Sequence, residues 1–177
     1  MEKVPLDLGH LATSTAEQML LLAEEKSITV RCDVQPGVEV EGDPTRLKQV
    51  VVNLLDNAIR YTGEGGSIAV TAVKQNGWAT LVVADNGAGI PPEALPHVFE
   101  RFYRADKARS RYSGGSGLGL SIVNAICAAH RGEVEIASTE GVGTTVTIRL
   151  LPARSHKATD RRTEPATAHL VQDWRIQ

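Results

Sequence analysis

The sequence has little of what several classes of protein require. Its 177 residues include two cysteines, Cys32 and Cys127, which are too few for a disulfide framework or a cysteine-rich metal cluster. Aromatic residues make up 4%, which argues against a surface that stacks nucleic-acid bases. The formal charge of −2 provides no strong attraction for nucleic acid or a membrane surface. We therefore expect no nucleic-acid partner, and reduced thiols of the kind found in cytosolic proteins.

Hydropathy and length set further limits. No apolar run approaches the roughly 20 residues of a membrane-spanning helix, and no signal peptide is recognisable at the start. A chain of 177 residues suits one domain with a sizeable core. Because periodicity is lost from Pro152 onward, we expect a domain over residues 1–151 and a largely disordered tail over 152–177.

Familiar nucleotide-binding signatures are absent as well. No G-x-x-x-x-G-K-[ST] P-loop occurs, and no H-R-D or D-F-G set of a eukaryotic-type protein kinase. Gly115-Ser-Gly-Leu-Gly119 contains G-x-G, but it follows a polar loop and not a strand, which excludes a Rossmann fold. Any nucleotide chemistry in this chain must therefore use a different architecture.

The stretch Leu47–Tyr61 predicts the helix around which the chain is organised. Asp43 suits the N-cap, Pro44 suits the first helical position, and Gly63 follows as a stop. At about 100° per residue, one face of this helix is apolar. That face consists of Leu47, Val51, Leu54, Leu55 and Ala58.

A polar stripe runs beside this apolar face. It consists of Asn53, Asn57, Arg60 and Tyr61. Residues four apart lie one turn apart on the same side of a helix. Because Asn forms helices less well than Glu or Lys, a stripe needed only for solubility would carry those residues instead. The stripe is therefore a candidate ligand surface, with an ordinary polar face as the alternative.

Periodicity and turn signals predict the remaining elements. Asn76-Gly77 is the strongest local signal for a tight type I′ hairpin. Residues 105–116 are charged and glycine-rich, which predicts a mobile loop, and 152–168 are expected to be disordered. Helices are predicted at 6–26 and 117–130, with a helical turn within 92–97. Strands are predicted at 27–34, 38–40, 67–74, 78–84, 133–138 and 144–151.

Two glycine-containing motifs carry the candidate chemistry. Asp85 ends a strand and begins the sequence Asp-Asn-Gly-Ala-Gly-Ile-Pro. A carboxylate at the end of a buried strand is costly unless it accepts a hydrogen bond, and an amine on a planar base could be the donor. Gly115–Gly119 opens a helix, whose free N–H groups favour phosphate. The alternatives are an ordinary turn and a solvated charged loop. The cations flanking the second motif are Arg101, Arg104, Lys107, Arg109 and Arg111.

Taken in order, these motifs resemble the ATP-binding catalytic domain of bacterial two-component sensor histidine kinases, within the GHKL ATPase superfamily. Residues 53–62 are similar to the N box, 85–90 to the G1 box, 99–104 to the F box and 115–122 to the G2 box. Residues 141–145 resemble the last conserved turn. The resemblance covers about residues 6–151. It is specific because all the boxes occur in the correct order and spacing.

The resemblance implies an α+β fold. The expected architecture is a two-layer α/β sandwich of the Bergerat type, with a mixed five-stranded sheet packed on three helices and an ATP lid. ATP would lie between the N-box helix and the lid. The expected function is that of an enzyme, an ATP:protein-histidine phosphotransferase that requires Mg²⁺.

The resemblance also implies a role for each motif residue. Asp85 would accept the adenine amino group together with a water shared with Thr144 or Thr145, and Tyr61 would stack near the adenine or ribose. Asn57 with Asn53 would hold Mg²⁺. Arg60 would lie near the phosphates and Arg104 near the terminal phosphate. The base pocket would be shaped by Gly87, Gly89 and Ile90, and the phosphate loop would comprise Gly115, Gly117, Leu118 and Gly119.

Asn53 separates branches of the superfamily. Members that hydrolyse ATP resemble this N box but carry Glu at that position as the base that activates water. Asn cannot take up a proton, whereas phosphoryl transfer to a reactive imidazole needs positioning and charge neutralisation more than a base. The residue therefore favours a histidine kinase with slow hydrolysis. The alternatives are a serine-phosphorylating relative of the anti-sigma-factor type and a non-catalytic docking module.

The acceptor histidine of the family is missing. His10 is followed by Leu-Ala-Thr and not by the acidic residue of the family motif, and the other four histidines do not match either. We therefore expect a monomeric catalytic fragment that does not phosphorylate itself. Its expected partners are its own dimerisation and acceptor domain, absent here, and a response regulator. The resemblance implies a cytoplasmic domain whose parent lies in the bacterial inner membrane.

Overall fold

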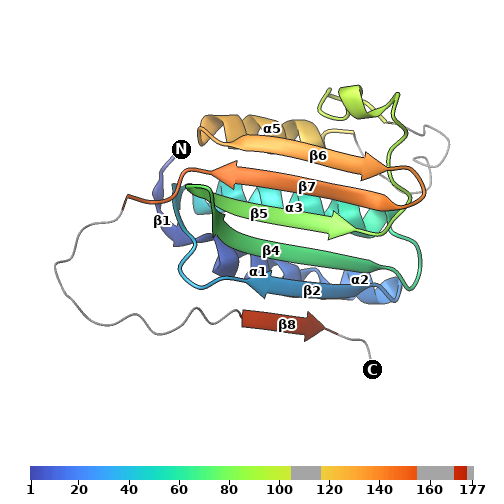
Figure 1. Ribbon diagram of the computed structural model, residues 1–177, viewed down its shortest axis with the longest axis horizontal. Helices are drawn as coiled ribbons and strands as arrows, with labels where there is room; N and C mark the ends of the chain where they lie inside the picture. Colours follow the sequence, from blue (N-terminus) through green and yellow to red (C-terminus); the bar gives the residue numbers. More distant parts are fainter. Residues whose placement is uncertain (105–116, 155–169, 175–177) are drawn as a thin grey trace.

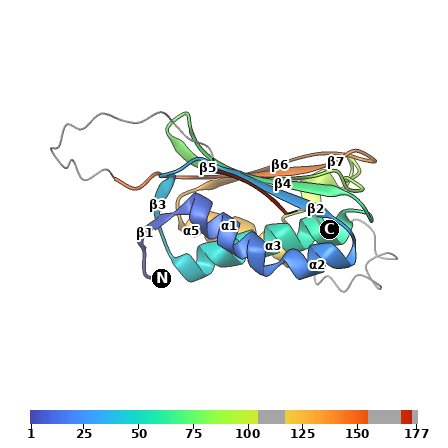
Figure 2. The same cartoon turned by 90° about the horizontal axis from the view of Figure 1, so that it is seen from below.

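A computed structural model of the chain describes residues 1–104, 117–154 and 170–174 (Figure 1). Helices α1, α3 and α5 lie on one face of the main sheet, and no described helix covers the other face (Figure 2). The helices are α1 (Leu8–Gln18), α2 (Leu20–Glu25), α3 (Pro44–Tyr61), the 3₁₀ turn η1 (Leu95–His97) and α5 (Gly119–Ala129). The strands are β1 (Val4–Asp7), β2 (Thr29–Val34), β3 (Glu39–Gly42), β4 (Ser67–Gln75), β5 (Trp78–Asp85), β6 (Glu133–Thr139), β7 (Gly143–Leu150) and β8 (Leu170–Trp174).

The main sheet is mixed and has the strand order β6-β7-β5-β4-β2-β8. Only the β2–β4 pair is parallel, and the other pairs are antiparallel. The predicted five strands and their layer of helices are therefore confirmed as an α+β sandwich. The sixth strand, β8, was not predicted. It comes from the C-terminal segment and pairs with β2 along five residues.

The hairpin between β4 and β5 is the predicted one. Asn76 and Gly77 both have positive φ angles, 52° and 79°, as a type I′ turn demands. Gln75 pairs with Trp78 across the turn. The turn sets the register of β5, which brings Asp85 to the far end of the strand, opposite Ile68.

The predicted single helix over 6–26 is wrong. Residues Val4–Asp7 form β1, which pairs with β3, and the helix is interrupted at Met19 between α1 and α2. Asp7 ends the strand and caps α1, because its carboxylate accepts the His10 N–H at 2.9 Å. β1 pairs with a distant part of the chain, since Leu6 lies opposite Val40. The local apolar period does not reveal such a long-range contact.

Helix α3 begins as predicted. The carboxylate of Asp43 accepts the Arg46 N–H at 3.1 Å, and Pro44 occupies the first turn. His130, at the end of α5, adds a second anchor that was not predicted. Its Nδ1 lies 2.8 Å from the Ile126 carbonyl, so that nitrogen carries the hydrogen, and its Nε2 accepts the Asp43 N–H at 3.0 Å. The start of α3 is therefore fixed to the end of α5.

The other end of α3 is fixed by a lysine. Lys26 follows α2, and its ammonium donates to the carbonyls of Ile59 and Arg60 at 2.7 and 3.1 Å. A cation at the last carbonyls of a helix opposes the negative end of the helix dipole. Because Tyr61 is the next residue, this contact also fixes the point where α3 meets the loop after β5.

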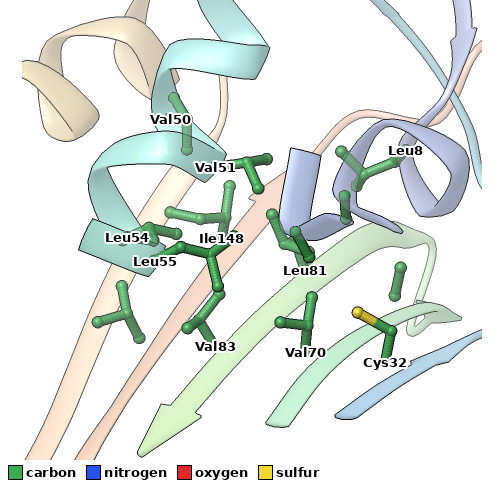
Figure 3. Packing of buried hydrophobic residues seen from close by; sticks show 14 of the residues in the cluster. Leu8, Cys32, Val50, Val51, Leu54, Leu55, Val70, Leu81, Val83 and Ile148 are labelled. Carbon is green, nitrogen blue, oxygen red and sulfur yellow. The ribbon is translucent and has the colours of Figure 1, made fainter. Parts of the chain in front are cut away.

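The core lies between α1, α3 and α5 and the sheet (Figure 3). Figure 3 shows Val51, Leu54 and Leu55 of α3 facing side chains of the central strands, including Leu81 and Ile148. All five are at most 2% exposed. Fully burying such a side chain contributes about 1.5–3 kcal/mol, so this contact sets the position of α3 over the sheet.

Two predictions fall wholly or partly outside the described residues. The loop 105–116 lies outside them, as does 155–169 of the tail. Of the tail, residues 152–154 are described: Pro152 bridges to Val40, and the Ala153 N–H donates to the Glu39 carbonyl at 2.8 Å. None of the described helices has the length and apolarity needed to cross a membrane.

Candidate functional site

A cavity of about 550 Å³ opens where the end of α3 meets the end of β5, the start of β7 and the start of α5. It is lined on one side by α3 and on the other by the loop after Asp85, by Val98, Tyr103 and Arg104, and by residues 117–120. Most of the predicted site residues come together here. Those lining the cavity are Asn53, Asn57, Arg60, Tyr61, Asp85, Gly89, Ile90, Arg104, Gly117, Leu118, Gly119 and Thr144.

Three predicted site residues are not among those that line the cavity. Gly115 lies outside the described residues. Gly87 supports the site without lining the cavity. Its N–H donates to Asp85 Oδ1 at 2.8 Å, and a side chain at this position would collide with the Tyr61 carbonyl. Thr145 follows Thr144 on β7, and successive strand residues point to opposite faces. The geometry therefore favours Thr144 for the role that the sequence left open between the two threonines.

The fold places Asp85 where burial disfavours the charged form of its carboxyl group. Burial raises its pKa above the ordinary aspartate range, even though hydrogen bonds from the backbone N–H groups of Gly87 and Thr144 oppose that shift. A buried, incompletely compensated carboxylate costs stability, and such groups gather at functional sites. Its remaining acceptor capacity faces the cavity that it lines.

The loop after Asp85 is fixed by backbone hydrogen bonds from both sides. The Ala88 N–H donates to the Tyr61 carbonyl at 3.0 Å, and the Gly141 N–H donates to the Ala88 carbonyl at 2.7 Å. Gly89 has a φ of 69°, and a side chain there would collide with the Thr139 carbonyl. Glycine is required at this position both by the left-handed backbone and by the approach of the β6–β7 turn.

The polar stripe of α3 faces the cavity as predicted, but its contacts differ along its length. Arg60 forms an ion pair with Asp56 at 2.9 Å, an i, i+4 contact that the sequence analysis did not include. The Asn53 amide lies 3.4 Å from the Gly119 carbonyl, which is long for a hydrogen bond. Among the described residues, none forms a hydrogen bond with the side chain of Asn57. Tyr61 is 44% exposed at the rim.

The glycine turn before α5 closes the opposite side. Gly117 has a φ of 72°, and its carbonyl accepts the Phe102 N–H at 3.0 Å. Phe102 itself has a φ of 65°, which is uncommon for a residue with a side chain. The two segments therefore pack backbone against backbone, and this brings Arg104 and the first N–H groups of α5 to the cavity.

Several lining residues were missed by the sequence analysis. Strand alternation could have identified two of them: Val83 lies two residues before Asp85, and Val146 two residues after Thr144, so each shares its neighbour's face. Glu140 lies in the β6–β7 turn, and nothing local marks it as part of the site. The other missed residues include Pro91, Val98, Tyr103, Leu120 and Ile122.

The chemistry of the lining is that of a nucleotide site. Apolar walls and a carboxylate occupy one end, and amides, two arginines and a helix start occupy the other. No group of three or more His, Cys, Asp or Glu side chains within the described residues could hold a metal by itself. A divalent cation in this cavity would therefore rest on amide oxygens and on its ligand's own oxygens, as Mg²⁺ often does with phosphates.

Comparison with known proteins agrees with this chemistry. Residues 42–154 match the family of histidine kinase-, DNA gyrase B- and HSP90-like ATPases, and the chain belongs to that family. Within it, the similar proteins are sensor histidine kinases. SenX3 of Mycobacterium tuberculosis is 37% identical over 161 residues, which cover 91% of this chain and 39% of SenX3. The resemblance inferred from the motifs is thus confirmed.

Solved structures agree with the fold. The mycobacterial sensor histidine kinase MprB has a TM-score of 0.71 at 32% identity, covering 84% of this chain and 96% of that one. Full-length ShkA in complex with AMPPNP has a TM-score of 0.74 at 32% identity, covering 85% of this chain and 31% of ShkA. The chain thus corresponds to an ATPase domain, and it spans less than half the length of its curated relatives.

Proposed function

We propose that this chain binds Mg²⁺-ATP and supplies the γ-phosphoryl group for phosphorylation of a histidine on a dimerisation and acceptor domain that is absent from it. The phosphoryl group would then pass to a response regulator. The observation that carries the proposal is the single cavity that joins the Asp85 carboxylate to the α3 amides and the start of α5. The family supports ATP as the ligand, and the names of the relatives, which are sensor histidine kinases, support the acceptor domain and the response regulator as partners.

At the base end, Asp85 would accept hydrogens from the adenine amino group. Val83 and Val146 offer apolar contacts to the base, because they lie on the same strands and faces as Asp85 and Thr144. A site built around a buried acceptor rejects ligands that lack the matching donor, because the acceptor would stay unpaired. This end therefore accounts for selectivity for adenine.

At the phosphate end, the groups available are cations, amides and backbone N–H groups. Arg104 and Arg60 supply positive charge, and the start of α5 supplies N–H groups and the positive end of a dipole. Asn53 and Asn57 fit Mg²⁺, since both present amides to the cavity one helical turn apart. When bound, the ion neutralises phosphate charge and orients the transferred group.

The cavity offers no general base at the expected position. Asn53 cannot take up a proton, so a water there would not be activated by that residue. An imidazole acceptor carries its own lone pair, and the chain's task is to orient the phosphoryl group and stabilise its charge. We therefore infer slow ATP hydrolysis, and no phosphorylation of this chain by itself.

Calorimetric titration tests the proposal directly. We expect ADP and a non-hydrolysable ATP analogue to bind in the micromolar range, more tightly with Mg²⁺ than without. Asp85→Asn should weaken binding about 5- to 150-fold, because loss of a buried hydrogen-bond partner costs about 1–3 kcal/mol. Absence of binding to a folded sample would refute the proposal and favour a docking module with a vestigial pocket.

A second experiment concerns the partner. Incubation with γ-labelled ATP should leave this chain unlabelled, whereas an added acceptor domain of a sensor kinase should become labelled at histidine. Label accumulating on this chain alone would contradict the proposed division of labour. We also propose that the free chain is monomeric, and that it works on the cytoplasmic side of a parent anchored in the inner membrane.

A further inference from the structure

Ser138 lies behind the cavity and not among its lining residues, yet it contacts three parts of the base end. It is a half-buried residue of β6, and its register partner on β7 is Thr144. The Ile90 N–H donates to Ser138 Oγ at 2.8 Å. The same hydroxyl lies 2.9 Å from the Gly143 carbonyl and 2.8 Å from Thr144 Oγ1. One hydroxyl thus joins the loop after Asp85 to both residues at the start of β7.

The hydrogens of this cluster can be assigned by counting. A serine hydroxyl has one hydrogen and two lone pairs. The Ile90 N–H uses one lone pair, and the Gly143 carbonyl can only accept, so it takes the Ser138 hydrogen. The second lone pair is then satisfied by the hydrogen of the Thr144 hydroxyl. This arrangement makes three hydrogen bonds, whereas turning the Ser138 hydrogen toward Thr144 would make two.

The assignment fixes what Thr144 offers to the cavity. With its hydrogen directed to Ser138, the Thr144 hydroxyl presents only lone pairs to the space that it lines. Thr144 is also the register partner of Asp85 on the neighbouring strand. Two acceptors, a hydroxyl and a carboxylate, therefore stand side by side at the end of the sheet.

We propose that Ser138 is a positioning residue for base selection, which holds the Thr144 hydroxyl as a hydrogen-bond acceptor beside Asp85. A pair of acceptors suits a purine edge that carries an amino group with two hydrogens, bound directly or through a water. It disfavours a 6-oxo purine, which presents an acceptor at the same place. The inference rests on the proposed function. It assigns the choice between 6-amino and 6-oxo purines to Asp85, Thr144 and Ser138, whereas the motifs alone suggest Asp85 and one threonine.

The test compares ADP with IDP, its 6-oxo counterpart, by calorimetry on the full chain with Mg²⁺. The measured quantity is the ratio of the two Kd values. Ser138→Ala frees the Thr144 hydrogen to turn into the cavity and donate. We expect the preference for ADP to fall about fivefold, the value of one hydrogen bond of ordinary strength. Ser138→Thr, which keeps the hydroxyl, should restore the preference.

Two further variants separate positioning from structure. Thr144→Val removes the hydroxyl that Ser138 orients, so adding Ser138→Ala to it should not change the ratio again. Thr147→Val, on the same strand but the opposite face, is the matched control and should leave the ratio as it is. If Ser138→Ala does not fold, Ser138→Cys keeps the side-chain shape while forming only weak hydrogen bonds.

Each outcome is decisive. A reduced ratio that depends on Thr144 supports the inference. Equal weakening of ADP and IDP by Ser138→Ala would show a structural role only, and an unchanged ratio would show no role; either overturns it. If the unsubstituted chain binds neither nucleotide, the proposed function fails as well. If it binds ADP in an Asp85-dependent way but Ser138→Ala has no effect on the ratio, only the present inference fails.

Discussion

At the Asp85 end of the cavity the polar groups form hydrogen bonds with one another, whereas at the other end the amides of Asn53 and Asn57 have few hydrogen-bond partners among the described residues. Asp85 accepts from Gly87, and the loop that follows is bonded to α3 and to the β6–β7 turn. In contrast, the Asn53 contact with Gly119 is long, and the glycine turn beyond it continues into residues outside the described part.

The difference shows how the two ends divide the work of binding. Groups already fixed by the protein lose little freedom on binding, so the base end can discriminate between ligands at small entropic cost. The amides of Asn53 and Asn57, at the other end, would gain contacts from the ligand and its cation. On the proposed function, base selectivity would be set by the free fold, and phosphate binding would depend on contacts that form only with the ligand and its cation.

The largest effect on the free energy of unfolding is expected from a substitution that disturbs the backbone next to Asp85. Gly89→Ala should destabilise the fold by about 3 kcal/mol, because its side chain meets the Thr139 carbonyl and the φ of 69° disfavours it. Gly141→Ala is the matched control, with a φ of 77° but open space around it, and should cost only about 1 kcal/mol. Urea denaturation measures both. Equal losses would show that the close approach does not matter.

The metal side of the comparison is tested by Asn57→Ala. We expect Mg²⁺ to tighten binding of the ATP analogue much less in this variant than in the unsubstituted chain. Loss of one metal ligand should reduce the effect of Mg²⁺ on Kd about tenfold, which corresponds to about 1–2 kcal/mol of binding free energy. Binding without Mg²⁺ and the urea midpoint should change little, since no described residue forms a hydrogen bond with this side chain. Equal binding with and without Mg²⁺ in the unsubstituted chain would contradict the assignment.

The pKa of Asp85 makes the base end dependent on pH. Because burial raises that pKa in the folded chain, protonation is favoured by folding. Its contribution to stability is therefore present below the ordinary aspartate pKa of about 3.9, and is lost as the pH rises through the folded value. Nucleotide affinity should change in the opposite direction, falling as the pH falls through the same value.

Asp85→Asn is the control for both trends. This variant should lose the pH dependence of affinity and of stability in this range, and at neutral pH its fold should be at least as stable as that of the unsubstituted chain. Calorimetry and urea midpoints measured across pH distinguish the two trends. A variant that was clearly less stable at neutral pH would show that the carboxylate stabilises the free fold.

The smallest effect is expected at Arg60. Its ion pair with Asp56 is partly exposed, the side chains being 20% and 46% accessible, so Asp56→Asn should change stability by no more than about 0.5 kcal/mol. Loss of this ion pair removes one contact that holds the guanidinium, and the repulsion of a phosphate by the Asp56 carboxylate disappears with it. We expect the preference for the ATP analogue over ADP to rise less than threefold by calorimetry. A falling preference would mean that Asp56 orients Arg60 productively.

Local signals predicted the parts of the molecule that local forces build. The start of α3 at Asp43-Pro44, the Asn76-Gly77 hairpin and the strand leading to Asp85 each depend on a few adjacent residues, and each was found. The site residues were carried over from the motifs, and the fold brings most of them to one cavity. The apolar walls at Val83 and Val146 could also have been predicted, because they follow from the alternation of side chains along β5 and β7.

Contacts between distant segments account for what was missed. β1 exists because it pairs with β3, and β8 because it pairs with β2, and neither segment has a strong period of its own. The pairing of Arg60 with Asp56 is an exception, because it is local, and the i, i+4 rule applied to the predicted helix could have identified it. The role of Ser138 was not predicted for another reason. It depends on three partners, Ile90, Gly143 and Thr144, which are brought together by the fold and by the β6–β7 register.

The two borders of the main sheet differ in how they avoid self-association. At one border β6 carries the exposed Glu133 and Glu135, whose charges discourage a strand from another molecule. The other border is β8, which pairs with the hydrogen-bonding edge of β2, a strand whose Val30 and Cys32 are buried. Loss of the last residues would leave that edge open to any extended chain. We therefore expect a chain without β8 to associate with itself more readily than the full chain.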